Sequence, residues 1–276
     1  PRPRGGQVIA VWGPAGAPGR TSIAIGLAAE LAALGHRVVL ADVDTHGASI
    51  APALGMLDEA PGFAAACRLA GADALTHQEL DRIASRYESS AGSFWVLTGI
   101  GRPSRWPELS GERVLGAIRA CRDWADFTVL DTSSSLENDE EISSDLYAPR
   151  RNAATVTAVR EADRVIAVGS ADPVGLSRFL RSHVELLATA TTAEVIVAMN
   201  RVRASAMGMN PTGQVTHTLA RFGGIHSPVI VPHDQHAFDG AVLSAKTVTD
   251  VAPRSPARIA IRDLAARLAP DAVGER

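Results

Sequence analysis

The sequence predicts an α/β fold: a three-layer sandwich in which a mostly parallel, twisted sheet carries helices on both faces. Short runs of Val, Ile and Leu alternate along the chain with segments of helical spacing. These runs contain no polar alternation, which is typical of strands that are buried on both faces. A strand at residues 8–12, a helix at 21–34 that stops at Gly35, and a strand at 37–42 form a βαβ unit. Such a unit requires parallel pairing and a right-handed crossover.

The same alternation continues to the end of the chain. Buried strands are predicted at residues 94–97, 127–131, 165–169, 195–200 and 229–231. Helices are predicted at residues 62–70, 76–86, 112–124, 173–187, 212–222 and 255–268. Because there is no repeat and no shift in composition, we expect residues 1–6 to be the remnant of a linker and residues 7–276 to form a single domain.

Composition excludes several classes of protein. Of the 276 residues, 46% are apolar and 21% are charged, and the formal net charge is −3, which argues against disorder and against a nucleic-acid binder over its whole surface. No apolar run is long enough to span a membrane. Cys67 and Cys121 lie in predicted helices without metal or redox spacing, so we expect buried apolar side chains in a reducing, cytoplasmic compartment.

A glycine- and proline-rich turn follows the first strand and leads into a helix. Such a turn offers backbone N–H groups and the positive end of the helix dipole to an anion. The strict phosphate-loop pattern is not met, because Pro14 occupies the first glycine position and Arg20 the lysine position. Since a guanidinium is larger and flatter than an ammonium, we expect phosphate binding with slow turnover. A turn without a ligand is the alternative. The residues predicted to bind the nucleotide here are Gly13, Gly16, Ala17, Pro18, Gly19, Arg20, Thr21 and Ser22.

Carboxylates end two of the predicted strands. Asp42 and Asp44 end the second strand, which we expect to lie next to the phosphate loop. Asp131 ends an apolar run in the form of a strand whose aspartate holds Mg²⁺ in nucleotide-hydrolysing enzymes. Strands also end in aspartate simply because the residue favours turns. Taken together and in this order, the three carboxylates predict a magnesium site beside the loop.

These segments resemble the MinD/ParA family of P-loop ATPases over nearly the whole chain. Residues 35–44, Gly-His-Arg-Val-Val-Leu-Ala-Asp-Val-Asp, are similar to the family's G-(K/H)-R-V-L-L-(V/A)-D-x-D segment. Residues 161–166 and 172–177 look most like the CpaE/TadZ pilus-positioning branch, with an actinobacterial septum-site relative as an alternative. The resemblance implies a P-loop NTPase fold with ATP or ADP and Mg²⁺ as cofactors.

The resemblance also implies roles for individual residues. It places Thr21 on Mg²⁺, with Asp42 and Asp131 supporting the ion through water. Arg20 takes the place of the phosphate-binding lysine, and Asp44 orients the attacking water. We expect weak ATP hydrolysis from this set.

Two further segments resemble the part of the family site that holds the base. They are the strand end and the Pro-x-Asp loop that contact adenine, here Asn200, Arg201, Pro232 and Asp234. The family also has a lysine near the start of its loop that reaches a dimer partner's phosphates. Ala15 occupies that position here, a departure that argues against fast hydrolysis and against ATP-clamped dimerisation.

The implied function is a slow or conditional ATPase switch that positions a pilus, secretion or septum machine, as a homodimer with a protein partner. The implied location is the cytoplasm, with recruitment to the pole, the septum or the inner membrane surface. The first alternative is a scaffold dimer that does not hydrolyse nucleotide. The second is a ParA-like DNA-binding partitioning ATPase, whose candidate phosphate-gripping residues are Arg150, Arg151, Arg160, Arg164, Arg178 and Arg181.

Three smaller features each have a functional and a simpler interpretation. His233 and His236 with Asp234 could hold a metal, although loop packing or base contact is the favoured interpretation. Residues 133–135 form a serine run that could sense a terminal phosphate or could be a plain turn. Residues 137–141 form an acidic run that is typical of a solvated loop.

Overall fold

The computed structural model describes residues 5–16, 18–57, 60–137 and 150–269. Its eight-stranded sheet has the order β3-β4-β2-β5-β1-β6-β7-β8. Every pairing in it is parallel except that of β3 with β4. The strands are β1 Gln7–Trp12, β2 Val38–Asp42, β3 Ser85–Tyr87, β4 Phe94–Leu97, β5 Phe127–Asp131, β6 Arg164–Ser170, β7 Glu194–Val202 and β8 Val229–Pro232.

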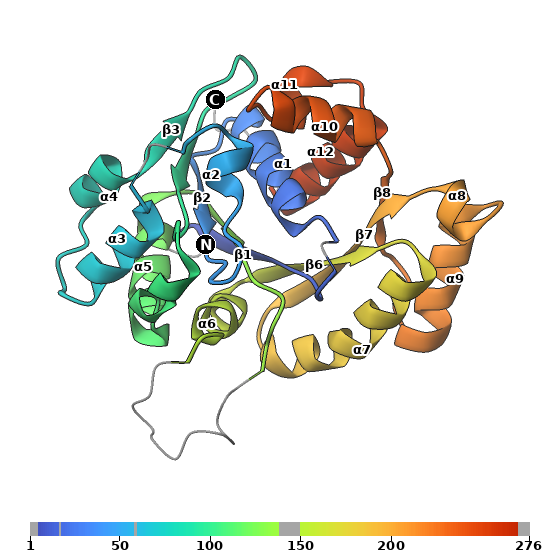
Figure 1. Cartoon of the computed structure of the whole chain (residues 1–276), viewed down its shortest axis with the longest axis horizontal. Helices are drawn as coiled ribbons and strands as arrows, with labels where there is room; N and C mark the ends of the chain where they lie inside the picture. The colour runs from blue at the N-terminus through green and yellow to red at the C-terminus, as the bar shows by residue number, and fades with distance from the viewer. Residues whose placement is uncertain (1–4, 17, 58–59, 138–149, 270–276) are drawn as a thin grey trace, which may run out of the picture.

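Helices cover both faces of this sheet, as Figure 1 shows, which confirms the predicted three-layer α/β fold. The first half of the chain contributes α1 Arg20–Ala33, α2 Ile50–Ala53, α3 Gly62–Ala70, α4 His77–Ile83, a 3₁₀ turn at Pro103–Glu108 and α5 Gly111–Trp124. The second half contributes α6 Ala153–Glu161, α7 Pro173–Thr189, α8 Ala204–Met207, α9 Pro211–Gly223, α10 Gln235–Leu243, α11 Val248–Val251 and α12 Pro256–Leu268.

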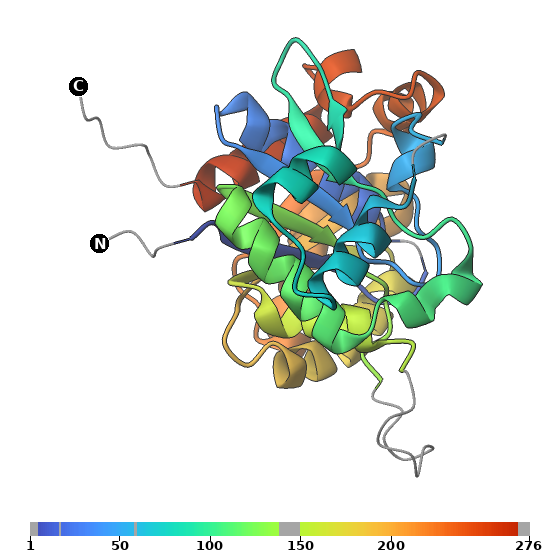
Figure 2. The same cartoon turned by 90° about the vertical axis from the view of Figure 1, so that its left-hand side faces the viewer.

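The hydrophobic core lies in two layers, one on each side of the sheet. On one side, α1 and α12 pack against alternate strand residues such as Ile9 and Val129. On the other side, α3, α5, α6 and α7 pack against the intervening residues such as Ala10 and Leu130. Turned by 90°, the molecule shows α3, α4 and α5 in front of the β3–β4 edge of the sheet (Figure 2). Cys67 and Cys121 are both buried in this second layer, as expected.

The prediction of one helix over residues 76–86 is wrong in its last part. Helix α4 ends at Ile83, and residues 85–87 form the antiparallel edge strand β3. Tyr87 explains the difference, because its ring stacks on Phe94 at 4.9 Å and its hydroxyl donates to Asp250 at 2.6 Å. These contacts with distant residues override the local helical pattern.

The end of the second strand, β2, lies next to the phosphate loop as expected, because Asp44 pairs with Arg20, but β2 does not pair with β1 in the sheet. Strand β5 lies between β1 and β2, so the crossover through α1 skips one position in the sheet. In this register Asp42 at the end of β2 pairs directly with Asp131 at the end of β5. The two carboxylates therefore lie side by side at the carboxyl edge of the sheet.

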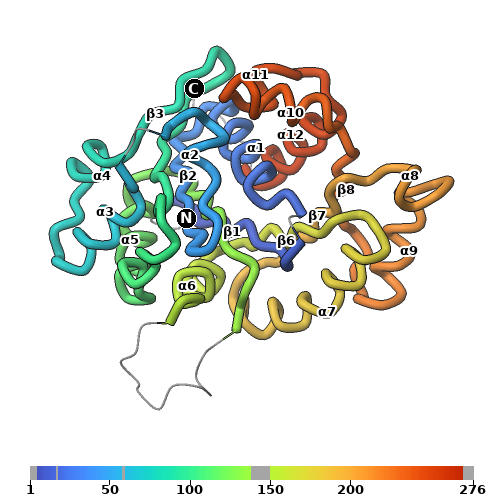
Figure 3. Tube along the Cα trace, viewed as in Figure 1, coloured from blue at the N-terminus to red at the C-terminus, as the bar shows by residue number. Residues whose placement is uncertain are grey.

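A buried ion pair joins α1 to α12. Arg258 donates from Nε to Glu30 Oε1 at 2.6 Å and from Nη2 to Oε2 at 2.9 Å. Thr249 adds a third hydrogen bond to Glu30, whose side chain is only 2% exposed. Figure 3 shows that α1 and α12 run close together although the paired residues are 228 positions apart. Within the described residues, no helix is long and apolar enough to cross a membrane.

Candidate functional site

The turn between β1 and α1 has a backbone that exposes its amide groups. Gly16 and Gly19 adopt positive φ angles of 109° and 98°, which side chains rarely permit. Helix α1 starts after Gly19, and in the described part of the chain no side chain caps it. The first-turn N–H groups of α1 are therefore available to an anion. Of the predicted loop residues, Ala17 lies outside the described residues.

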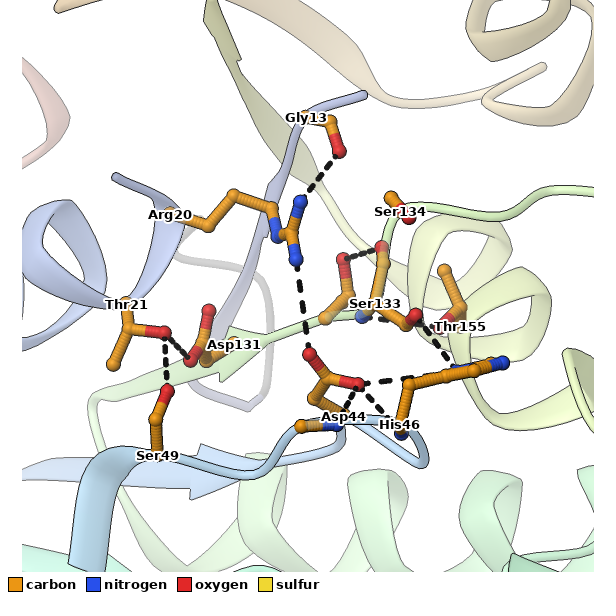
Figure 4. Close-up of polar contacts among 12 residues, drawn as sticks. Gly13, Arg20, Thr21, Asp44, His46, Ser49, Asp131, Ser133, Ser134 and Thr155 are labelled. Carbon is orange, nitrogen blue, oxygen red and sulfur yellow. Dashed lines mark hydrogen bonds and ion pairs between the residues drawn. The ribbon is translucent and has the colours of Figure 1, made fainter. Parts of the chain in front are cut away.

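Arg20 does not extend freely toward the expected phosphate position (Figure 4). Its Nη1 donates to the carbonyl oxygens of Gly13 and Pro14, at 3.0 and 3.2 Å. Its Nη2 lies 3.7 Å from Asp44 Oδ2, in an ion pair that is mostly shielded from water. Arg20 therefore binds a phosphate only after exchanging these partners.

Thr21 and Asp131 form the centre of the candidate magnesium site. The Thr21 hydroxyl donates to Asp131 Oδ2 at 2.6 Å and lies 3.0 Å from the Ser49 hydroxyl (Figure 4). Among the residues that the structure describes, the other oxygen, Asp131 Oδ1, is buried and has no hydrogen-bond partner. A buried acceptor without a partner is costly, so this oxygen favours a bound cation or water.

Asp42 adds a second buried carboxylate beside Asp131. Its Oδ2 accepts from the backbone N–H groups of Ser49 and Ile50 at 3.0 and 3.1 Å. Burial raises the pKa of Asp42 to about 7, and the charge of Asp44 contributes in the same direction. The pKa of Asp131 is also held well above its usual range, mainly by burial and secondly by the charge of the neighbouring Asp42.

This arrangement fits Mg²⁺. The ion prefers oxygen ligands and binds through one or two carboxylates together with water and phosphate oxygens. Thr21, Asp42 and Asp131 supply hard oxygens, and a dication would offset the repulsion between the two carboxylates. In the described ranges, no three His, Cys, Asp or Glu side chains form a metal site by themselves, and this includes His233 and His236.

The loops that follow β2 and β5 are joined by polar contacts. Asp44 Oδ1 accepts from the backbone N–H groups of His46 and Gly47 at 2.8 and 3.1 Å. The His46 ring nitrogen Nδ1 lies 3.0 Å from the Ser133 hydroxyl (Figure 4). Burial, followed by the charge of Arg151, lowers the pKa of His46, which favours the neutral ring. His46 and Ser49 were not predicted as site residues, because they belong to no motif in the sequence.

A pocket of about 450 Å³ lies next to the loop, where the base was expected. The structure brings together in its wall the predicted residues Ser22, Asn200, Arg201, Pro232 and Asp234. The wall also contains His233, for which base contact was one of the favoured interpretations, and four residues that were not predicted, namely Arg203, Gln235, Phe238 and Asp239.

Asn200 connects the pocket to the phosphate loop. Its Nδ2 donates to the carbonyl oxygen of Pro18 at 2.8 Å, and its Oδ1 accepts from the backbone N–H of Arg201. Asp234 instead caps α10 through Ala237 and accepts a 2.6 Å hydrogen bond from Ser255. Both side chains therefore have structural partners in addition to any contact with a base.

Gly19→Ala is expected to weaken nucleotide binding by at least about tenfold, because the new Cβ would collide with Asn200 Nδ2 at a strained φ. Calorimetric titration with ADP measures this loss. Gly101→Ala is the matched control, since a Cβ there meets nothing within 4 Å and the affinity should not change. Equal affinities for the two variants would contradict the position assigned to the loop.

Two of the arginines considered for DNA binding, Arg164 and Arg178, lie far apart on the fold. Arg164 starts β6 and is bound to Glu194 and to the carbonyl oxygen of Leu268. Arg178 lies on α7, which follows the opposite, carboxyl end of β6. Arg164 therefore lies at the amino ends of the parallel strands, whereas Arg178 lies near their carboxyl ends.

No protein-family model and no curated protein matches this chain. Solved structures do match it in fold. The chain superposes on a ParA family ATPase from Chlorobium tepidum with a TM-score of 0.74 at 17% identity, covering 94% of this chain and 98% of that one. The septum site-determining protein MinD from Pyrococcus horikoshii, complexed with Mg-ADP, gives 0.71 at 16% identity and covers 95% of each chain. MinD in the MinC:MinD complex of Aquifex aeolicus gives 0.69 at 16% identity and covers 98% of each. The chain thus shares the fold of MinD and ParA ATPases.

Proposed function

We propose that this chain binds ATP or ADP with Mg²⁺ and acts as a slow or conditional ATPase switch within a single domain at residues 7–276. The observation that carries the proposal is the buried, unpartnered Asp131 Oδ1 among the described residues, next to Thr21 and Asp42. Thr21 lies in the first turn of α1, which no described side chain caps, and the next residue, Ser22, lines a pocket of suitable size for a base. A MinD of the same fold was solved with Mg-ADP, which supports the same ligand here.

Different residues would bind the metal ion, the phosphates and the base. Thr21, Asp42 and Asp131 would hold Mg²⁺, directly or through water. The ion, when bound, neutralises negative charge on the phosphates. Backbone N–H groups of Gly16 and of residues 19–21 would cradle the phosphates, and the pocket around Asn200 and Pro232 would take the base.

Arg20 and Asp44 link phosphate binding to hydrolysis. When Arg20 turns from Gly13 and Pro14 to the phosphates, its ion pair with Asp44 also breaks. Asp44 is then free to orient a water molecule for attack. Because an arginine must exchange three partners before this happens, turnover is slow.

The same exchange supplies a switch. Asp44 holds the loop after β2 through His46 and Gly47, and His46 contacts the loop after β5 through Ser133. A change at Asp44 therefore alters both loops and with them a partner surface. We propose that this surface serves a homodimer and a partner protein of a pilus, secretion or division machine, in the manner of the CpaE/TadZ or septum-site branch. Recruitment to the pole, the septum or the inner membrane surface belongs to the same proposal.

Asp44→Ala should reduce phosphate release from Mg-ATP to background, because the water loses its orienting carboxylate. The measurement is release of inorganic phosphate from purified protein, with ADP affinity as the control for an intact site. Asp263→Ala is the matched control variant, since that exposed carboxylate pairs with Arg262 on α12 and should leave turnover in place. Equal release from Asp44→Ala and the parent chain would overturn the assignment.

A scaffold that does not hydrolyse nucleotide is the second candidate function. The observations that favour it are Ala15 in place of a loop lysine and the three partners that hold Arg20. It predicts no phosphate release and a mass that ATP does not change. Sedimentation with and without Mg-ATP distinguishes the two, because only the switch should change its mass.

A further inference from the structure

A second, smaller cleft of about 160 Å³ lies against the phosphate loop. One wall is the loop itself, at Pro14, Ala15 and Gly16, and the other is the start of α7. Three arginines border this cleft, Arg178, Arg201 and Arg203, against a single carboxylate, Asp172. The cleft is therefore positively charged, although the chain as a whole is slightly acidic.

Arg178 approaches the loop more closely than an ordinary neighbour would. Its Nη1 lies 2.6 Å from the point where a Cβ of Gly16 would be, so only glycine leaves room for the guanidinium. Side chains on a helix lean toward its N-terminus, which carries Arg178 back from α7 over the loop. The cleft and the phosphate loop thus share this cation.

Arg178 is also available for a ligand. It is exposed, and within the described ranges it forms no ion pair. Arg203 is already engaged, because its Nη1 donates to the carbonyl oxygen of Arg201 and its charge acts on Asp172. Arg181, one turn further along α7, donates to the Ser177 carbonyl of its own helix.

The charge balance of the site requires such a cation. Three carboxylates, Asp42, Asp44 and Asp131, already face the place where the terminal phosphates would lie. Arg20 is the one cation that the described loop residues contribute, and its charge is shared with Asp44. Mg²⁺ offsets part of the remaining negative charge, which leaves the terminal phosphate without a second positive partner from the loop.

We propose that Arg178 supplies this second cation and contacts the terminal phosphate of bound ATP. The loop residue on the opposite wall of the cleft, Ala15, has only a methyl group and cannot provide a charge. The inference rests on the proposed function. An arginine suits the role, because its planar fork bonds two phosphate oxygens at once. Since ADP lacks the terminal phosphate, Arg178 makes the site discriminate between ATP and ADP.

The test is calorimetric titration of the parent chain and Arg178→Ala with Mg²⁺ and either ADP or an ATP analogue that cannot be hydrolysed. Arg178→Ala should bind the ATP analogue about tenfold more weakly, from the loss of one charge-assisted contact, while its ADP affinity changes less than about twofold. Arg181→Ala is the matched control and should leave both affinities unchanged.

A rescue experiment separates a phosphate contact from a structural effect. Ala15→Lys places an ammonium on the opposite wall of the same cleft, so in the Arg178→Ala background it should restore affinity for the ATP analogue. Unfolding midpoints in urea should be equal for all variants, because both positions are exposed.

Three outcomes would overturn the proposal. If Arg178→Ala binds the ATP analogue as well as the parent does, Arg178 contacts no terminal phosphate, and the proposed function still stands. If it loses ADP and the analogue equally, Arg178 shapes the loop instead. If the parent chain binds neither nucleotide, the proposed function fails together with this inference.

Discussion

Arg258→Ala should lower the free energy of unfolding by about 3–5 kcal/mol, the largest effect that we expect from a single substitution. The substitution leaves Glu30 buried, 2% exposed, with the Thr249 hydroxyl as its remaining side-chain donor. A carboxylate shielded from water needs its counter-ion, and Arg258 provides two hydrogen bonds as well as the charge. Urea denaturation followed by far-UV circular dichroism measures the loss.

Two variants control this experiment. Arg262→Ala breaks an exposed pair with Asp263 on the same helix and should cost less than about 1 kcal/mol. Replacing both members of the buried pair, Glu30→Leu with Arg258→Met, should recover most of the loss, because no charge then remains buried. A small effect of Arg258→Ala, similar to that of Arg262→Ala, would show that the buried pair does not stabilise the fold.

The stability of the ligand-free protein should fall as the pH rises from about 4 to 7, and Asp42 is one cause, beside Asp131. Its pKa is raised to about 7 in the folded state, mainly by burial, against about 4 in the unfolded chain. Between these values the folded protein keeps a proton that the unfolded chain loses, so unfolding becomes easier with each unit of pH. The total change from this group is about 4 kcal/mol and levels off above the folded pKa.

The measurement is the free energy of unfolding at pH 5 and pH 8 for the parent chain and Asp42→Asn. The difference between the two pH values should be smaller in the variant, which cannot ionise at this position, while buried Asp131 still contributes. Mg²⁺ with ADP should also reduce the difference in the parent chain, because a dication stabilises the ionised carboxylates. An unchanged pH dependence in Asp42→Asn would contradict the buried, protonated state of Asp42.

The sequence pattern predicted those strands and helices that depend mainly on neighbouring residues in the chain. The apolar runs that end in Asp42 and Asp131 became buried strands, and Gly35 lies where α1 has just ended. Residues 85–87 could not be assigned in this way, because Tyr87 is held by Phe94 and Asp250 from elsewhere in the chain. Their strand depends on partners that a local window does not contain.

The order of the strands in the sheet and the partners of Arg20 could not be predicted from the sequence either. Nothing in the apolar run before Asp131 indicates that its strand would separate β1 from β2, since that order depends on packing across the whole sheet. Likewise, the position of Arg20 is fixed by the loop carbonyl oxygens and Asp44. The pocket wall, by contrast, contains all four residues that the family resemblance named for the base, Asn200, Arg201, Pro232 and Asp234.

The hydrogen bond from Asn200 to Pro18 makes one amide group common to the two halves of the site. A base that binds in the pocket and changes the position of the Asn200 amide must also change the rigidity of the phosphate-loop turn at Pro18. A bare nucleoside, which carries no phosphate at all, should therefore slow deuterium uptake at the amides following Pro18. Base binding and phosphate binding would then be thermodynamically coupled, so that a ligand in one subsite would change the affinity of the other.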